Sequence, residues 1–151
     1  MSETATATSE ASRIAQFMGL KRPNTIGEVK LAEMVAAGLP TETLDAVVKR
    51  IDPRGRILSV NDLVPRSSLH RMKTQNKALS KDQSEMVFAM SKLFSEALRL
   101  YHGDAQLASM FLSRPHPMLN DESPIAVAKK STAGVDLVLS VLMRADAGVA
   151  A

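Results

Sequence analysis

Apolar residues recur every three or four positions through most of the chain, which is the spacing of amphipathic helices. The longest such stretch runs from Ser84 to about Tyr101, and shorter ones begin near Asp104, Ser123 and Thr132. No segment alternates apolar and polar residues as a half-buried strand does. The pattern therefore predicts an all-α protein.

Two short helices are expected in the first half of the chain. The first covers about Val29–Ala36 and ends at Gly38, because glycine readily adopts the left-handed conformation that closes a helix. The second follows Pro40 and ends before Pro53. The chain begins instead with Thr, Ala, Ser and Glu and no apolar periodicity, and we expect residues 1–24 to be a disordered N-terminal arm.

Residues 25–78 have the arrangement of a helix-turn-helix lobe. A short helix over Ser59–Val64 is followed by Pro65 and by a second helix over Arg66–Lys73, in which Leu69 and Met72 face inward. Polar side chains of the second helix are left to contact DNA, with Arg54, Arg56 and Lys77 as supporting phosphate contacts. The predicted DNA-binding residues are Arg66, Ser67, Ser68, His70, Arg71 and Lys73.

The charge distribution favours the same segment. The chain has a net charge of +3, but residues 49–81 alone carry nine Lys or Arg and two Asp, a net charge of +7, and the flanking parts are each −2. A basic block of this kind indicates a surface for a polyanion, since each cation that meets a phosphate releases counterions. The alternative is an ordinary solvated basic patch. Five aromatic residues and no Trp argue against a base-stacking platform.

Residues 79–146 read as a helical domain with a wide apolar core. The helix that begins at Ser84 contributes Met86, Met90, Leu93, Phe94, Ala97, Leu98 and Tyr101 to this core. The next helix, capped by Asp104, contributes Leu107, Ala108, Phe111 and Leu112. The last helix begins at Ser131 or Thr132 and contributes Val135, Val138, Leu139, Leu142 and Met143. Leu137 and Val141 of the last helix lie outside the apolar side formed by these residues. We expect both to be exposed contacts for another subunit or a partner.

The composition gives little support to catalysis. There is no cysteine, and His70, His102, His116 and the acidic residues form no metal-ligand or nucleophile spacing. His102-Gly103-Asp104 is best explained as a helix end followed by an N-cap. We expect no enzyme activity, no cofactor and no metal. No apolar run reaches the roughly 20 residues of a membrane helix, so we expect a cytoplasmic protein.

The second half of the chain contains several characteristic motifs, which are Leu79-Ser-x-x-x-Ser84-Glu85, Gly103-Asp104-x-x-x-Ala108-x-x-Phe111-Leu112-Ser113-x-Pro115, Ser123-Pro124, Gly134-x-x-x-Val138 and Leu142-x-Arg144-x-x-x-Gly148-Val149. Together they resemble one family, the Xre/ParS/MbcA antitoxins, over roughly residues 38–151. Phe111 stands where that family usually has Trp, Asn120-Asp121 where it has glycines, and His70-Arg71 where a double arginine is frequent.

The resemblance implies an antitoxin of a type II toxin–antitoxin operon, paired with a RES-domain toxin that hydrolyses NAD or ADP-ribosylates a protein. It also implies that residues 79–146 bind this toxin and that residues 147–151 enter its NAD pocket as an inhibitory tail. A slim apolar segment ending in a carboxylate suits an anion-recognising cleft. A frayed terminus is the alternative. The residues implied in toxin binding are Arg144, Asp146, Gly148, Val149, Ala150 and Ala151.

Two further expectations concern assembly. A homodimer would place two copies of the second helix of the helix-turn-helix on an inverted repeat in its own promoter, alone or as a hetero-oligomer with the toxin. The main alternative function is a helix-turn-helix transcription regulator whose C-terminal helices only dimerise or sense a ligand. A scaffold that binds neither DNA nor toxin is a third possibility.

Overall fold

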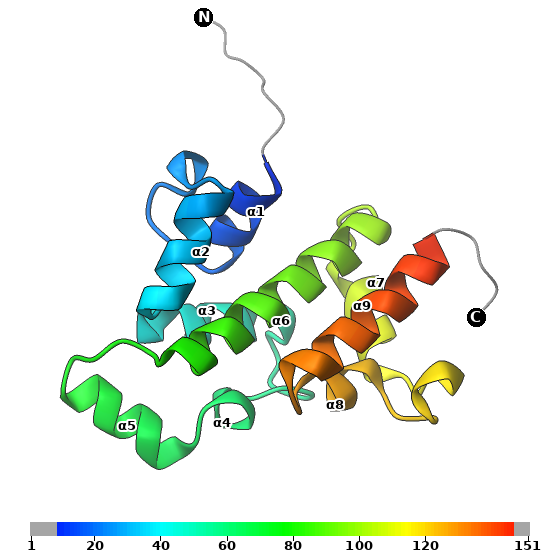
Figure 1. Cartoon of the computed structure of the whole chain (residues 1–151). Helices are drawn as coiled ribbons and strands as arrows, with labels where there is room; N and C mark the ends of the chain where they lie inside the picture. Colours follow the sequence, from blue (N-terminus) through cyan, green and yellow to red (C-terminus); the bar gives the residue numbers. More distant parts are fainter. Residues whose placement is uncertain (1–8, 147–151) are drawn as a thin grey trace, which may run out of the picture.

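The computed structural model describes residues 9–146, and within that range it contains α-helices, two short 3₁₀ helices and no strand (Figure 1). The all-α prediction is therefore confirmed. The elements are α1 (Glu10–Phe17), η1 (Pro23–Thr25), α2 (Glu28–Ala37), α3 (Thr41–Ile51), α4 (Val60–Leu63), α5 (Arg66–Thr74), α6 (Lys81–Leu100), α7 (Ala105–Ser113), η2 (Pro117–Leu119), α8 (Pro124–Ala128) and α9 (Thr132–Asp146).

The long helix α6 is the centre of the molecule. Helices α1 and α2 pack on one side of it, and α9 runs alongside it on another side, with α8 beneath α9 (Figure 1). Its side chains Val87, Met90, Leu93 and Phe94 are fully buried. The buried apolar residues form one continuous core from α1 to α9, so the two halves of the chain share α6 rather than folding around separate cores.

The start of the chain differs from the prediction. Residues 10–17 form α1, capped by Ser9, whose side chain accepts a hydrogen bond from the N–H of Ser12 at 3.1 Å. Ile14 and Ala15 are buried, and the ring of Phe17 lies 5.5 Å from that of Phe94. The predicted disordered arm over residues 1–24 is therefore wrong for residues 9–24, because α1 contributes to the core. Residues 1–8 lie outside the described residues.

Contacts between distant segments fix the start of α6. Gly38 adopts φ +109°, and a Cβ there would lie 2.5 Å from the carbonyl oxygen of Leu79, so the close approach requires glycine. The N–H of Leu79 donates to the carbonyl of Leu39 at 2.9 Å, and the N–H of Leu39 donates to Ser84 Oγ at 2.8 Å. The turn after α2 is thereby held against the first turn of α6.

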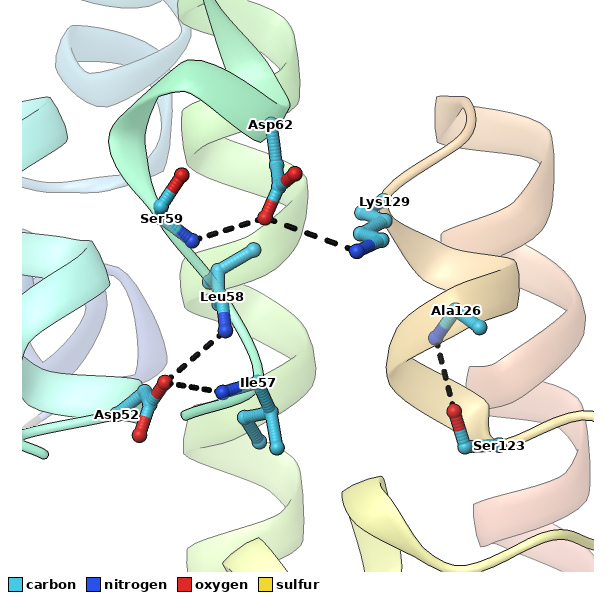
Figure 2. Close-up of polar contacts among 8 residues, drawn as sticks. All are labelled: Asp52, Ile57, Leu58, Ser59, Asp62, Ser123, Ala126 and Lys129. Atoms are coloured by element: carbon cyan, nitrogen blue, oxygen red, sulfur yellow. Dashed lines mark hydrogen bonds and ion pairs between the residues drawn. The ribbon is translucent and has the colours of Figure 1, made fainter. Parts of the chain in front are cut away.

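The predicted starts of α7, α8 and α9 are confirmed, whereas α6 begins at Lys81, three residues before the predicted Ser84. Asp104 accepts hydrogen bonds from the N–H groups of Gln106 and Leu107, and the hydroxyl of Ser123 accepts one from Ala126 (Figure 2). Two of the predicted core positions are wrong. Leu107 and Met143 are 42% and 53% exposed, because α7 and α9 pack through adjacent faces instead.

Candidate functional site

Helix α9 is the best-anchored surface helix of the C-terminal half. It packs against α6 and α8 through Val135, Val138, Val141 and Leu142, each at most 2% exposed. At Gly134 the helix passes so close to α8 that a Cβ would lie 2.1 Å from the carbonyl oxygen of Val127. The position and rotation of α9 are thus fixed by backbone contact as well as by apolar burial.

The opposite side of α9 faces solvent and forms what we call the α9 outer face. Leu137 and Met143 are the large apolar side chains on it, 49% and 53% exposed. The expectation that Leu137 is exposed is confirmed, but that for Val141 is wrong, because Val141 is buried against the core. The α9 outer face consists of Asp136, Leu137, Ser140, Met143 and Arg144.

The residues predicted to bind the toxin divide into two groups. Arg144 lies in the last turn of α9 and is exposed. Asp146 is the last residue of α9, and its side chain is outside the described residues, as are Gly148, Val149, Ala150 and Ala151. The described residues therefore end where the predicted inhibitory tail begins.

The residues predicted to contact DNA lie together on α5. Arg66, Ser67, His70, Arg71 and Lys73 are exposed, whereas Leu69 on the other side of the helix is buried. Ser68 is half-buried. Lys73 Nζ also forms an ion pair with Asp45 Oδ2 on α3 at 3.2 Å, so this one cation is partly neutralised. The exposed side of α5 is cationic over most of its length.

Short polar contacts position the α4–α5 segment (Figure 2). The buried carboxylate of Asp52 accepts hydrogen bonds from the N–H groups of Ile57 and Leu58 at 2.6 and 2.9 Å, which fixes the turn after α3. Asp62 on α4 accepts from the N–H of Ser59 at 2.9 Å and forms an ion pair with Lys129 at the end of α8 at 3.6 Å. This pair joins the α4–α5 segment to the C-terminal helices.

Asp104 and His116, two of the polar groups considered for catalysis, have structural partners. Asp104 is the N-cap of α7, as predicted, and His102 precedes it in a left-handed turn with φ 54°. His116 Nδ1 accepts from the N–H of Met118, and its ring meets Phe111 edge-on at 6.4 Å. Among residues 9–146, no three His, Asp or Glu side chains are grouped so that they could hold a metal ion.

The comparison with known families concerns the part of the chain that carries α9. Residues 97–148 match the family described as the antitoxin Xre/MbcA/ParS C-terminal toxin-binding domain. The match covers 52 of the 151 residues of the chain. The family resemblance expected from the motifs is therefore confirmed for this part of the chain. No curated protein matches the chain.

The matched residues include the last turn of α6 and all of α7, α8 and α9. Phe111, at the position where the family usually has Trp, is half-buried and lies 6.5 Å from the ring of Tyr101. The α9 outer face is the most apolar exposed helix face within the matched residues, since Leu137 and Met143 both lie on it. No helix of the described residues is long and apolar enough to cross a membrane.

Helix α1 and the surface that it builds with α2 were not found from the sequence. A signal for α1 was present, because Ser9 is a favourable N-cap and Ala11, Ile14, Ala15 and Met18 follow at helical spacing. Two of these four residues are alanines, which give a weak hydrophobic pattern. Because the residues before Ser9 are polar, the whole segment was predicted to be a disordered arm.

Proposed function

We propose that the chain is the antitoxin of a type II toxin–antitoxin pair and that it neutralises a RES-domain toxin acting on NAD. In this proposal the C-terminal segment enters the toxin's active site and excludes the substrate. The toxin hydrolyses NAD or transfers ADP-ribose to a protein, and the antitoxin contributes shape and charge but no reactive group. Both proteins act in the cytoplasm.

The observation that carries the proposal is the geometry of α9 within the matched toxin-binding domain. Its buried side fixes the helix on α6 and α8, while its outer face leaves Leu137 and Met143 exposed to a partner. The sequence continues from this face through Arg144 to Gly148–Ala151. We infer a two-part contact, in which the α9 outer face holds the toxin and the residues after Asp146 block its cleft.

Deleting Gly148–Ala151 tests the blocking part. The truncated chain should still co-purify with its toxin, because the α9 outer face is intact, but co-expression should no longer protect cells. The toxin to use is the product of the adjacent reading frame. Full protection by the truncated chain would refute occlusion by the tail.

A matched variant tests the holding part. Changing Leu137 and Met143 together to Asp should abolish co-purification while leaving the fold intact, because both side chains are about half exposed. The control is Leu107→Asp, which places the same charge on an exposed apolar position of α7. Retained binding by the α9 variant would show that the toxin contacts another face.

A second proposed role is repression of the chain's own operon. The exposed cationic side of α5, within a segment of net charge +7, is suited to phosphate and base contacts. Two copies in a homodimer would then contact the two halves of an inverted repeat. Toxin bound to the C-terminal domain would make this a hetero-oligomer.

A gel-shift assay with the operon's promoter tests this role. Arg66→Ala with Arg71→Ala should weaken binding and reduce its salt dependence, since two phosphate or base contacts are lost. Lys21→Ala with Arg114→Ala removes the same charge from elsewhere on the surface and should have little effect. Equal affinities for the two double variants would refute the assignment. A plain transcription regulator would bind DNA but would not co-purify with the neighbouring toxin.

A further inference from the structure

An apolar groove lies between α1, α2 and α6, away from the surfaces discussed above. Its volume is about 380 Å³. Most of the residues that line it have aliphatic or aromatic side chains contributed by three helices. These residues are Ala11 and Ile14 of α1, Leu31, Ala32, Val35 and Ala36 of α2, and Phe88 of α6.

The exposed side of α2 extends this groove. Val29, Ala32 and Ala36 follow one another at intervals of three and four residues, which places them along one side of the helix. All three are exposed, and Val29, at 74%, is the most exposed large apolar side chain of the described residues. A stripe of small side chains beside a groove allows another helix to approach closely.

The rim of the groove is acidic. Glu10, Glu28 and Glu85 lie around it, and Lys92 is the one cation among the lining residues. None of the three glutamates forms an ion pair or a side-chain hydrogen bond within residues 9–146. Three unpaired carboxylates around an apolar floor favour a ligand with apolar side chains and positive charge.

We propose that this groove binds a basic amphipathic helix of a partner protein. This partner is a different protein from the toxin that contacts the α9 outer face. Helices dock in apolar grooves through residues spaced three and four apart, and charges at the rim select the partner. The partner helix would place aliphatic residues over Leu31, Val35 and Phe88. Its Lys or Arg residues would meet Glu10, Glu28 and Glu85.

Two other occupants fit the groove less well. In a symmetric dimer through this face, the three glutamates of one copy would approach those of the other copy, with a single lysine each to offset them. Residues 1–8 contain Glu3, no Lys or Arg, and Met1 as their one large apolar residue. Both therefore bring less positive charge to the rim than a helix rich in Lys or Arg would.

The groove is independent of the toxin-binding domain. All of its lining residues precede residue 97, where the family match begins. Helix α2 also lies across α6 from α9 (Figure 1). A partner helix in the groove would therefore leave the α9 outer face accessible, and the chain could hold both proteins at once.

A fluorescently labelled peptide tests the proposal with the full chain. The probe is a helical peptide of about 15 residues with leucines along one side and lysines beside them. Its control has every lysine replaced by glutamate. Fluorescence anisotropy should show binding of the lysine peptide, and the glutamate peptide should bind at least about tenfold more weakly.

Variants of the chain locate the binding site. Glu28→Gln with Glu85→Gln should weaken binding of the lysine peptide at least about fivefold, and Ala32→Trp, which fills the groove, should abolish it. Glu33→Gln is the matched control, because Glu33 is exposed on α2 but does not line the groove. This variant should bind like the unaltered chain.

Three results would overturn the proposal. The first is equal binding of the lysine and glutamate peptides. The second is binding that Ala32→Trp leaves unchanged. The third is a dimer, detected by light scattering, that Ala32→Trp converts to a monomer, since a second copy of the chain would then occupy the groove.

Discussion

Helices α9 and α5 each expose one face to solvent, yet they are attached to the molecule very differently. Helix α9 buries Val135, Val138, Val141 and Leu142 against α6 and α8, whereas α5 buries Leu69 alone. Each buried aliphatic side chain contributes about 1.5–3 kcal/mol. The position of α9 is therefore much more costly to disturb than that of α5.

The exposed faces of the two helices also differ in their chemistry. Helix α9 presents Leu137 and Met143, which need a complementary protein surface and a fixed orientation to gain binding energy. Helix α5 presents mainly cationic side chains, which attract phosphates over a longer range and tolerate adjustment. We infer that the firmly packed helix with exposed apolar residues suits a protein partner, and that the lightly packed basic helix suits a polyanion such as DNA.

The largest expected effect comes from truncating the buried anchor of each helix. Leu142→Ala should lower the free energy of unfolding by about 4 kcal/mol, because the surrounding side chains of α6 and α8 cannot close the cavity. Leu69→Ala should cost only about 2 kcal/mol, since the thinly packed α5 can settle inward. Urea denaturation measures both.

The exposed Leu137 provides the control for this comparison. Leu137→Ala should change the free energy of unfolding by no more than about 0.5 kcal/mol. If Leu69→Ala costs as much as Leu142→Ala, then α5 is held as firmly as α9 and the contrast between the two helices is wrong.

An intermediate effect is expected at Asp52. Asp52→Ala leaves the N–H groups of Ile57 and Leu58 without their buried acceptor and should cost about 2 kcal/mol. Hydrogen exchange should accelerate over residues 57–74 while α9 keeps its protection. Glu33→Ala, at an exposed carboxylate on α2, is the control. Equal acceleration in α9 would mean that the α4–α5 segment and α9 unfold as one unit.

The smallest effect is expected for the ion pair that joins the two regions. Asp62 and Lys129 are each about one third exposed, and their charged atoms lie 3.6 Å apart. A double-mutant cycle should therefore give a coupling energy below about 1 kcal/mol. A coupling of several kcal/mol would show that α4 is rigidly tied to the toxin-binding domain.

Most helices and the positions of their ends could be predicted from the sequence, because neighbouring residues determine them. Asp104 and Ser123 cap α7 and α8 as predicted, and Gly38 ends α2 with a positive φ. Helix α1 was missed because its apolar side is partly alanine, so that its burial depends on Phe94 and other residues far along the chain. Tertiary packing of this kind leaves little trace in a local pattern.

The sequence predicted only in part which side of α9 packs against the core. Apolar residues occupy nearly every side of this helix, so the period alone does not say which side meets the core. Val141 is buried and Met143 is exposed, the reverse of the expectation, because the close contact at Gly134 sets the rotation of α9 against α8. The exposed side of α5 was predicted correctly, since the apolar Leu69 and Met72 mark the side that packs inward.

The most direct test of the central claim measures NAD consumption by the purified cognate toxin as antitoxin is added. The full chain should abolish NAD consumption at equimolar concentration. The chain without Gly148–Ala151 should bind the toxin, as seen by co-elution in gel filtration, yet leave most of its NAD consumption intact. Complete inhibition by this truncated chain would contradict the account, because the residues after α9 would then be unnecessary for blocking the toxin.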